Sequence, residues 1–307
     1  MNCPACGGGR TKLWLKGREH ALSFGSSRTD VSVSDMLRCI ECGFGFSAFR
    51  PSEDQLAGLY RKMDVAVYEA EAPGRLATAR RHMRILERYA APPGRLLEIG
   101  CASGRFLSLA CDAGWECTGV EPSAELFERA QRLLAGRARV IGSTLQSAGL
   151  ETGTFDVVAM FDVLEHVPDP ADFLRRVVSL MKPEGVLLMN LPDLDSPEAR
   201  LLGRRWPLLL PEHLNYFNRG SLERLASGMG LCRLGHGRRP ASFSVRYILY
   251  RLAQHGLPGA RVCQRLCGPL VGGWVLPVYM GELWSLWRSD GSGEHGIDRQ
   301  PGFTEQR

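Results

Sequence analysis

LEIGCASGRFL, residues 97–107, decides the fold of this chain, because an apolar strand in it runs through a glycine turn into a helix. In open α/β sheets, ligands bind where strands end, and small residues there let a ligand approach the backbone. The spacing Gly100-x-x-x-Gly104 differs from the GxGxxG pattern that places a pyrophosphate on a helix N-terminus. Glu98, just before the turn, would repel a diphosphate and suits a cationic ligand.

A second acidic residue, Glu121, ends the next apolar run in GVEP, residues 119–122. It follows the first acid by about 20 residues, the separation at which an acid in this kind of sheet reaches a ribose. A carboxylate there accepts hydrogen bonds from both ribose hydroxyls of a nucleoside. Glu98 and Glu121 together favour a nucleoside ligand that also carries a positive charge.

Four cysteines near the N-terminus form two similar pairs, Cys3-Pro-Ala-Cys6-Gly and Cys39-Ile-Glu-Cys42-Gly. Each pair presents two thiolates to one ion, and the glycine lets backbone N–H groups turn toward the sulfurs. Two pairs complete the closed four-thiolate shell of structural zinc, so we predict a zinc ribbon. The alternative is a redox CxxC, which would need only one of the two motifs.

Short apolar runs alternate with helical patterns from residue 95 onward, which is typical of a parallel, doubly wound sheet. Strands are expected at residues 96–99, 115–120, 140–141, 155–161 and 186–190, with weaker signals at 231–234 and 242–245. Helices are expected at residues 105–113, 124–135, 171–181 and 221–229. We therefore predict an α/β fold, a doubly wound, Rossmann-like, mostly parallel sheet with a small N-terminal zinc ribbon and a helical C-terminal extension.

Four stretches resemble the motifs of class I S-adenosylmethionine-dependent methyltransferases. Residues 97–107 resemble the first motif, 119–123 (GVEPS) the second, 155–170 (FDVVAMFDVLEHVPDP) the one that lines the methyl-transfer site, and 185–192 (GVLLMNLP) the fifth. The resemblance covers about residues 95–231 and implies S-adenosylmethionine as cofactor. It implies that the cofactor contacts residues at the ends of four strands: Glu98, Gly100, Cys101, Ala102, Gly104, Glu121, Pro122, Thr144, Leu145, Phe161, Asp162 and Val163.

The chain departs from the family pattern at Ala102, where glycine is common, although alanine is small enough for the cofactor still to fit. The end of the third strand, GSTL at 142–145, lacks the acid often found there, so adenine recognition would rely on backbone groups. Residues 212–217 (EHLNYF) and the following helix resemble a bacterial subfamily that acts on small molecules. The resemblance implies an acceptor such as a nucleotide sugar, a polysaccharide precursor or another secondary metabolite, methylated on oxygen or carbon.

His166, His213 and Tyr216 are the candidate catalytic bases for removing a proton from the acceptor. His166 follows the fourth strand, over the expected site, and an imidazole titrates in a suitable pH range. His213 and Tyr216 lie three residues apart in a segment able to close over a substrate. In the alternative interpretation, Glu165 and His166 only fix their loop by hydrogen bonds.

The 307 residues suffice for one catalytic domain and a small appendage. We expect a zinc ribbon at residues 1–48, a helical linker at 49–94, the methyltransferase domain at 95–246, a basic, apolar helical extension at 247–288 and a disordered tail at 289–307. Tyr60 and Tyr68 in the linker would cover the cofactor or pack in a core.

The net charge of +5 is unevenly distributed, since residues 231–281 contain seven arginines and no Asp or Glu. This region would meet an anionic membrane surface or a phosphorylated substrate, or form a solvated basic face. The first cysteine pair starts at position 3, so no signal peptide is expected, and the other six cysteines show no paired spacing. We expect a cytoplasmic protein, with peripheral attachment to the inner face of the membrane as an alternative.

Two other functions compete with a small-molecule methyltransferase. In an RNA base methyltransferase, the ribbon would bind RNA, but its charges are nearly balanced and it lacks a basic-aromatic stripe, so nucleic acid is disfavoured as a partner. In a non-catalytic scaffold, the ribbon and the Rossmann-like domain would bind partners. The set of Glu98, Gly100, Gly104 and Glu121 argues against a scaffold, because a protein without the cofactor needs no ribose-binding acid there.

Overall fold

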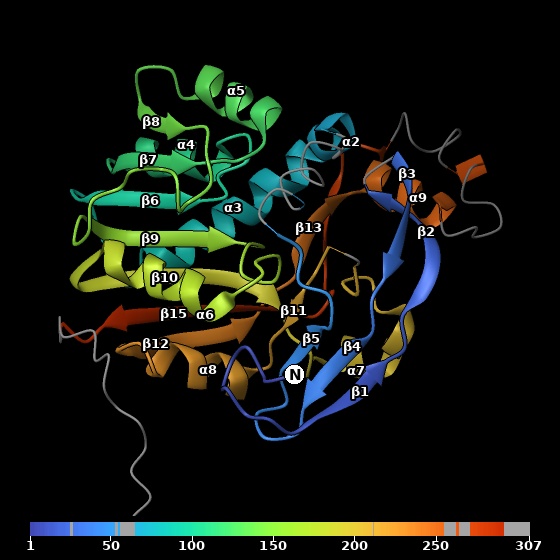
Figure 1. Cartoon of the computed structure of the whole chain (residues 1–307). Coiled ribbons are helices and arrows are strands. Elements are labelled where there is room, and N and C mark those ends of the chain that lie inside the picture. Colours follow the sequence, from blue (N-terminus) through green and yellow to red (C-terminus); the bar gives the residue numbers. More distant parts are fainter. Residues whose placement is uncertain are drawn as a thin grey trace, which may run out of the picture.

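The computed structural model describes residues 1–24, 27–52, 55, 65–210, 212–254, 262–263 and 271–291. Its centre is a seven-stranded sheet with the strand order β12-β15-β10-β9-β6-β7-β8 (Figure 1). The strands of this sheet are β6 (Arg95–Ile99), β7 (Glu116–Val120), β8 (Ala138–Ile141), β9 (Phe155–Phe161), β10 (Met181–Pro192), β12 (Leu231–Arg238) and β15 (Glu282–Ser289).

Five of these strands, from β8 to β10, run parallel, and β15 runs antiparallel between β10 and β12. The parallel strands therefore end at one edge of the sheet, which faces the right in Figure 1. The expected α/β class and mostly parallel sheet are confirmed, and each of the five predicted central strands is present.

Side chains alternate between the two faces of the sheet, and each face has its own core. Leu96 belongs to the core under α3 (Ala72–Leu86), α4 (Arg105–Asp112) and α5 (Ala124–Leu133). Leu97, the next residue, belongs to the core under α6 (Pro170–Leu180) and α8 (Arg219–Ser227). This period of two, repeated in neighbouring strands, anchors both faces of the sheet and specifies the register in which the strands pair.

The expected helical extension at 247–288 is wrong for its second half. α9 (Val245–Gln254) is helical, but β14 (Val275–Val278) and β15 are strands, and β15 lies inside the main sheet. Leu283, Leu286 and Trp287 are almost fully buried, so β15 lacks the alternating pattern of a half-exposed strand. A short apolar run buried on both faces cannot be distinguished from a helix by periodicity. The expected tail falls largely on residues 292–307, which lie outside the described part.

The predicted ribbon contributes three strands to a second sheet, with the order β1-β4-β5-β11. β1 (Thr11–Leu15), β4 (Met36–Cys39) and β5 (Gly45–Ser47) come from the N-terminal region, whereas β11 (Asn215–Tyr216) comes from the segment after β10. Phe44 packs against Phe217 with 4.7 Å between ring centroids, and both rings are fully buried. The N-terminal unit thus shares a sheet and a core with the main domain.

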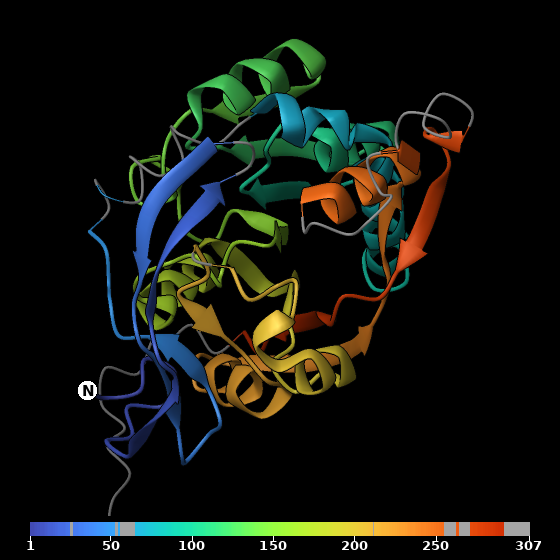
Figure 2. The same ribbon diagram turned by 90° about the vertical axis from the view of Figure 1, so that its right-hand side faces the viewer.

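Two further elements lie beside the carboxyl ends of the parallel strands. The hairpin of β2 (Arg18–Phe24) and β3 (Ser27–Val33) rises from the N-terminal sheet toward α2 (Val65–Ala70) (Figures 1 and 2). α7 (Pro197–Leu202) and the short helix η1 (Gly203–Arg205) follow β10, whose carboxyl end lies at the same edge of the sheet. These elements surround the edge at which a ligand of this fold is expected.

An insertion between β12 and β15 carries β13 (Ala241–Ser244), α9 and β14, and it packs on α3. The Arg81 guanidinium donates to the carbonyl of Pro240 at 2.8 Å, and the Ser242 N–H donates to Thr78 Oγ1 at 2.9 Å. Glu71 accepts a hydrogen bond from the Ser244 N–H at 2.6 Å. Within the described part of the chain, no helix combines the length and apolar character needed to cross a bilayer.

Candidate functional site

The loop between β6 and α4 adopts an unusual backbone conformation. Gly100, Ala102 and Gly104 have φ angles of 71°, 47° and 80°, and Gly104 caps the N-terminus of α4. Left-handed φ angles are natural for glycine and cost an alanine side chain about 1 kcal/mol or more. Gly100 also approaches the loop after β9, because a Cβ on it would lie 2.8 Å from Val163 Cγ2. The glycine pattern therefore encodes the turn and its close contact with the neighbouring loop.

Glu98 is 4% exposed, and its Oε2 atom has no hydrogen-bond partner. Burial raises the pKa of this carboxyl well above its ordinary value, and the Leu107 N–H only partly offsets the effect. An unpaired buried carboxylate is costly, and a cationic group beside it would remove that cost. This orphaned oxygen fits the positively charged amino group in the methionine part of S-adenosylmethionine.

Glu121 is 5% exposed and bridges the ends of β6 and β7. Its two oxygens accept from the N–H groups of Ala102 and Ser123, each at 2.8 Å. Burial raises the pKa of Glu121 from 4.5 to about 7, although these two bonds favour the charged form. Each oxygen keeps a second lone pair, so the carboxylate can still accept from a ribose.

The other predicted cofactor residues follow the adjacent strands of the sheet. Leu145 is buried beyond β8, Cys101 is buried in the β6 loop, and Phe161 to Val163 end β9. Asp162 has a φ of 56° and accepts from Asn190 Nδ2 at 3.1 Å. The structure thus brings the predicted residues together along one edge formed by β8, β7, β6 and β9, with Pro122 and Thr144 in the same loops.

α3 contributes Arg75 and His82, which sequence reasoning did not assign to the site, and α2 contributes Tyr68, which it did consider. The Arg75 guanidinium lies 3.5 Å from the centroid of the Tyr68 ring, and His82 stacks on Phe161 at 4.2 Å. Burial raises the pKa of Tyr68, and the negative charges of Glu121, Glu98 and Asp162 add to the shift. Tyr68 therefore lies close to the carboxylates, as expected for a residue covering the cofactor, while Tyr60 falls outside the described residues.

Glu282, at the start of β15, is the most distant contributor to this edge. Burial and the charge of Asp162 raise its pKa to about 8, and Asn190 partly offsets the shift. No motif surrounds Glu282, and β15 itself was expected to be helical. Only the position of β15 beside β10 brings this carboxyl to the site.

The two candidate histidines are held by backbone carbonyls. His166 Nδ1 lies 3.1 Å from the Glu212 carbonyl and His213 Nδ1 lies 2.9 Å from the Leu208 carbonyl, with 4.7 Å between ring centroids. Burial lowers the pKa of His166 to about 4 and also lowers that of His213, where the neighbouring His166 adds to the effect. Both imidazoles are therefore neutral near pH 7.

Tyr216 has a different environment from the histidines. Its hydroxyl donates to the Leu210 carbonyl at 3.0 Å and accepts from the Leu210 N–H at 3.1 Å. The side chain is 1% exposed, and its backbone pairs with β5 in the N-terminal sheet. The hydroxyl hydrogen of Tyr216 is therefore already engaged in a hydrogen bond. Burial also raises the pKa of Tyr216 well above its ordinary value. This geometry gives Tyr216 a part in positioning the segment that carries His213.

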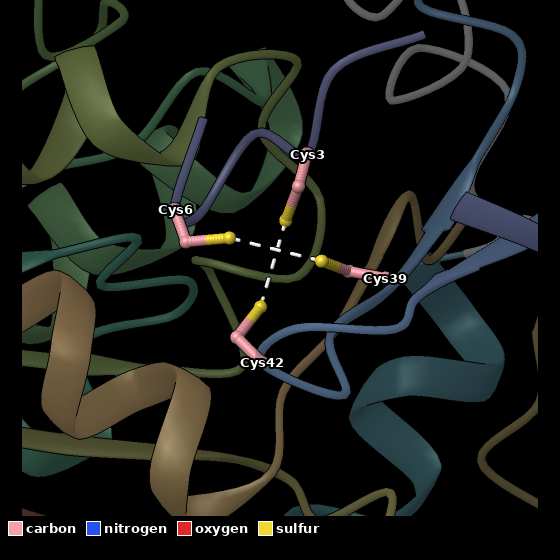
Figure 3. Close-up of side chains that lie close together, drawn as sticks. All are labelled: Cys3, Cys6, Cys39 and Cys42. Atoms are coloured by element: carbon pink, nitrogen blue, oxygen red, sulfur yellow. Dashed lines mark hydrogen bonds between the residues drawn. The ribbon is translucent and has the colours of Figure 1, made fainter. Parts of the chain in front are cut away.

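The four N-terminal cysteines converge, as Figure 3 shows. The Sγ atoms of Cys3 and Cys42 lie 3.6 Å apart, and those of Cys6 and Cys39 lie 3.7 Å apart. A tetrahedral shell with Zn–S bonds of about 2.3 Å spaces its sulfurs about 3.8 Å apart. A hydrogen bond from Cys42 lowers the pKa of Cys3 to about 5 and raises that of Cys42. The sulfur spacing fits a zinc ion.

The two cysteine pairs have matching backbone geometry. Gly7 and Gly43, which follow the pairs, have φ angles of 72° and 74°. Their N–H groups donate to the carbonyls of Cys3 and Cys39 at 2.8 and 3.1 Å. The glycine after each pair therefore turns the chain, although its own N–H donates to a cysteine carbonyl and not to a sulfur.

A family model described as "Methyltransferase domain" matches residues 68–232, more than half of the chain. A ubiquinone biosynthesis O-methyltransferase of Xanthomonas campestris is 31% identical over 110 residues, 34% of this chain and 46% of the relative. The mitochondrial ubiquinone biosynthesis O-methyltransferase of Schizosaccharomyces pombe is 33% identical over 126 residues, which are 39% of this chain and 44% of the relative. The chain thus matches about half the length of these curated relatives.

Two solved structures share the fold. A Galdieria sulphuraria protein described as a sarcosine dimethylglycine methyltransferase superposes with a TM-score of 0.50 and 17% identity, over 70% of this chain and 86% of that one. A Bacillus halodurans protein described as a methyltransferase superposes with a TM-score of 0.51 and 12% identity, over 70% and 99%. At these identities, the similarity concerns the arrangement of the sheet and helices.

Proposed function

We propose, on the premise that this chain belongs to the methyltransferase domain family of class I S-adenosylmethionine-dependent enzymes, that it methylates a small molecule. One observation carries the proposal. Two buried carboxyls, Glu98 and Glu121, end adjacent parallel strands on either side of a left-handed glycine turn, and one oxygen of Glu98 has no partner.

S-adenosylmethionine, when bound, supplies an activated methyl group on a sulfonium. Glu98 would hold the positively charged amino group of its methionine part, and Glu121 would accept from the ribose hydroxyls. The turn at residues 100–104 would let the cofactor approach the backbone, and Tyr68 would exclude water from above. The protein's part is therefore to orient the cofactor against the acceptor, which is most of what methyl transfer needs.

Transfer to a hydroxyl also requires a proton acceptor. His166 and His213 are neutral near pH 7, and their carbonyl partners fix the orientation of both rings. The relatives from Xanthomonas campestris and Schizosaccharomyces pombe are named O-methyltransferases, which favours oxygen over carbon. We propose as acceptor a nucleotide sugar, a polysaccharide precursor or another secondary metabolite.

The environment of the N-terminal unit supports a small molecule over RNA. Phe44 and Phe46, its central aromatic residues, are fully buried against the main domain. Proteins that bind single-stranded RNA stack bases on exposed aromatic rings. We propose that the four cysteines hold a structural zinc ion and that this ribbon supports the segment after β10. Salt-sensitive retention of RNA by the protein would favour the alternative.

We also propose that the insertion after β12 contacts anionic membranes. Trp274 and Tyr279 are 65% and 60% exposed, and the Val245 N–H donates to the Trp274 carbonyl at 2.8 Å, next to the exposed Arg246. Aromatic rings beside a cation suit a headgroup region. Flotation with vesicles containing phosphatidylserine should fall at high salt and in Trp274→Ala. Equal flotation with neutral vesicles would contradict this role.

Calorimetric titration of S-adenosylmethionine into the wild type, Glu121→Ala and Glu125→Ala tests the main proposal. Loss of the ribose contacts should cost about 2–3 kcal/mol, a tens- to hundredfold loss of affinity. Glu125 is an exposed carboxylate on α5 paired with Arg129, so its variant should bind like the wild type. Absence of binding by the wild type would favour the scaffold interpretation, whereas equal binding by Glu121→Ala would place the cofactor elsewhere.

A further inference from the structure

A second group of metal-ligand residues lies outside the cysteine cluster. Glu165 and His166 follow β9, and His213 precedes β11, yet one ligand atom of each lies within 4.8 Å of the others. Glu165 is 1% and His213 5% exposed, and His166 is half-buried. We call these three residues the histidine cluster. The sequence separates its two segments by more than 40 residues, so no spacing motif identifies it.

The ring orientations of both histidines are those of metal ligands. Nδ1 of His166 and Nδ1 of His213 each face a backbone carbonyl, which can only accept, so each Nδ1 carries the hydrogen. The lone pair of each neutral ring is therefore on Nε2. Histidine ligands usually donate their second ring N–H to such an outer partner, which fixes the tautomer and the ring plane.

Glu165 supplies an independent observation. Both of its carboxylate oxygens are buried, and neither has a hydrogen-bond partner. The Glu165 backbone carbonyl, by contrast, accepts from the N–H groups of Leu214 and Asn215 at 2.7 and 2.9 Å. These bonds join the loop after β9 to the segment that carries His213. The carboxylate is thus buried at a fixed place without a partner, an arrangement that a cation would stabilise.

We propose that Glu165, His166 and His213 bind a divalent transition metal ion of the zinc type. Two imidazoles and one carboxylate form a known ligand set for catalytic zinc and for related ions. Bonds of about 2.0–2.2 Å require ligand atoms about 3–4 Å apart, so small side-chain rotations close the shell. Three protein ligands leave a coordination position open, whereas the four cysteines close theirs.

The role of this ion rests on the proposed function, although its binding does not. A metal in the open site would bind the acceptor hydroxyl and lower its pKa, and the released proton would pass to solvent water. The oxyanion is then the nucleophile for methyl transfer. On this reading, His166 and His213 act through the metal rather than as bases.

Cobalt titration of the zinc-loaded protein tests the inference. The protein is first treated with a mild chelator until one zinc ion per chain remains, and Co²⁺ is then added. We expect one equivalent of Co²⁺ to bind with weak visible bands that lack thiolate-to-metal charge transfer. His213→Gln and Glu165→Gln should lose this binding at least tenfold, and His236→Gln, a half-buried histidine on β12, should not.

Each outcome decides the matter. Wild-type protein that takes up no cobalt beyond the cysteine cluster overturns the proposal, as does undiminished uptake by folded Glu165→Gln. If His213→Gln fails to fold, the wild-type titration and Glu165→Gln still decide. Calorimetry with S-adenosylmethionine separates the two proposals, because the cofactor should bind with and without the second metal. Loss of cofactor binding with intact cobalt binding would contradict only the proposed function.

Discussion

The cysteine cluster and the carboxyl edge of the main sheet are built in opposite ways. In the cysteine cluster, two short motifs supply four ligands, and the sulfurs lie at the spacing of a closed shell. At the carboxyl edge, Glu98 and Glu165 are buried with oxygens that have no partner. The first region supplies all four ligands for its proposed ion, whereas the second keeps buried oxygens for which the described residues offer no partner.

This difference teaches where stability and chemistry are located in the molecule. A closed shell leaves no position for a substrate, so a metal ion bound there would contribute to folding. Unpaired buried carboxylates and left-handed non-glycine residues such as Ala102 and Asp162 destabilise the empty site. Each of the following substitutions or titrations tests one side of that contrast.

The largest effect is expected for Cys39→Ser. Cys39 is 1% exposed and belongs to the core that the ribbon shares with α6 and α8. Loss of the metal should lower the free energy of unfolding by more than about 4 kcal/mol. Denaturant unfolding with zinc analysis measures the loss, and Cys232→Ser, at an exposed cysteine, is the control. An unchanged unfolding midpoint would mean that the ribbon is stable without its metal.

Gly104→Ala should have the next largest effect. Alanine at a φ of 80° is strained, and its Cβ would lie 2.7 Å from Leu134 Cδ1. We expect a loss of about 1–2 kcal/mol in the free energy of unfolding. Ala102→Gly is the matched reverse change at a φ of 47° and should gain up to about 1 kcal/mol, reduced by unfolded-state entropy. Equal losses in both variants would contradict this assignment of backbone strain.

The pH dependence of cofactor affinity tests Glu121. Its pKa is raised from 4.5 to about 7, so the free protein holds this proton until near neutrality. Between these values the unfolded chain has already lost the proton, so this group lowers stability as pH rises from 4.5 to 7. Cofactor binding needs the carboxylate, and affinity should rise about eightfold between pH 6.0 and 7.5. Calorimetry measures the rise, and Glu121→Gln should flatten it.

The smallest effect, and of opposite sign, is expected for Glu165→Gln in metal-free protein. Burial raises the pKa of Glu165 well above its ordinary value. The amide therefore replaces a carboxyl that already resists ionisation, and the free energy of unfolding should rise by at most about 1 kcal/mol. Denaturant unfolding in the presence of a mild chelator measures this change in the free energy of unfolding. Glu128→Gln, on the exposed face of α5, is the control. A loss as large as that of Cys39→Ser would make Glu165 a structural residue and remove the contrast.

Much of the central sheet could be predicted because its signals are local. The apolar runs that became β6 to β10 are bounded by turns, and the glycine turn at residues 100–104 requires left-handed φ angles. β15 could not be predicted in the same way. It is buried on both faces, and the insertion that separates it from β12 carried only a weak strand signal, at residues 242–245.

In the candidate site, too, some residues could be predicted from local motifs and others could not. Glu98 and Glu121 stand next to motif glycines, so their neighbours in the chain reveal them. Tyr216 was one of three candidate bases, and its hydroxyl is bound to Leu210, because the segment folds back on itself before joining β5. Glu282 reaches the edge only through the pairing of β15 with β10.

The sequence by itself determined the cysteine cluster, the glycine turn and the two acids at the ends of β6 and β7. These three features depend on φ angles, ligand spacing and the positions of strand ends, each of which is set by a few neighbouring residues. Only the tertiary structure decided that β11 completes the ribbon's sheet, that Glu282 belongs to the edge, and that Glu165, His166 and His213 meet. Such contacts arise when burial of separate segments brings their side chains together. The spacing of the residues along the chain therefore does not predict these contacts.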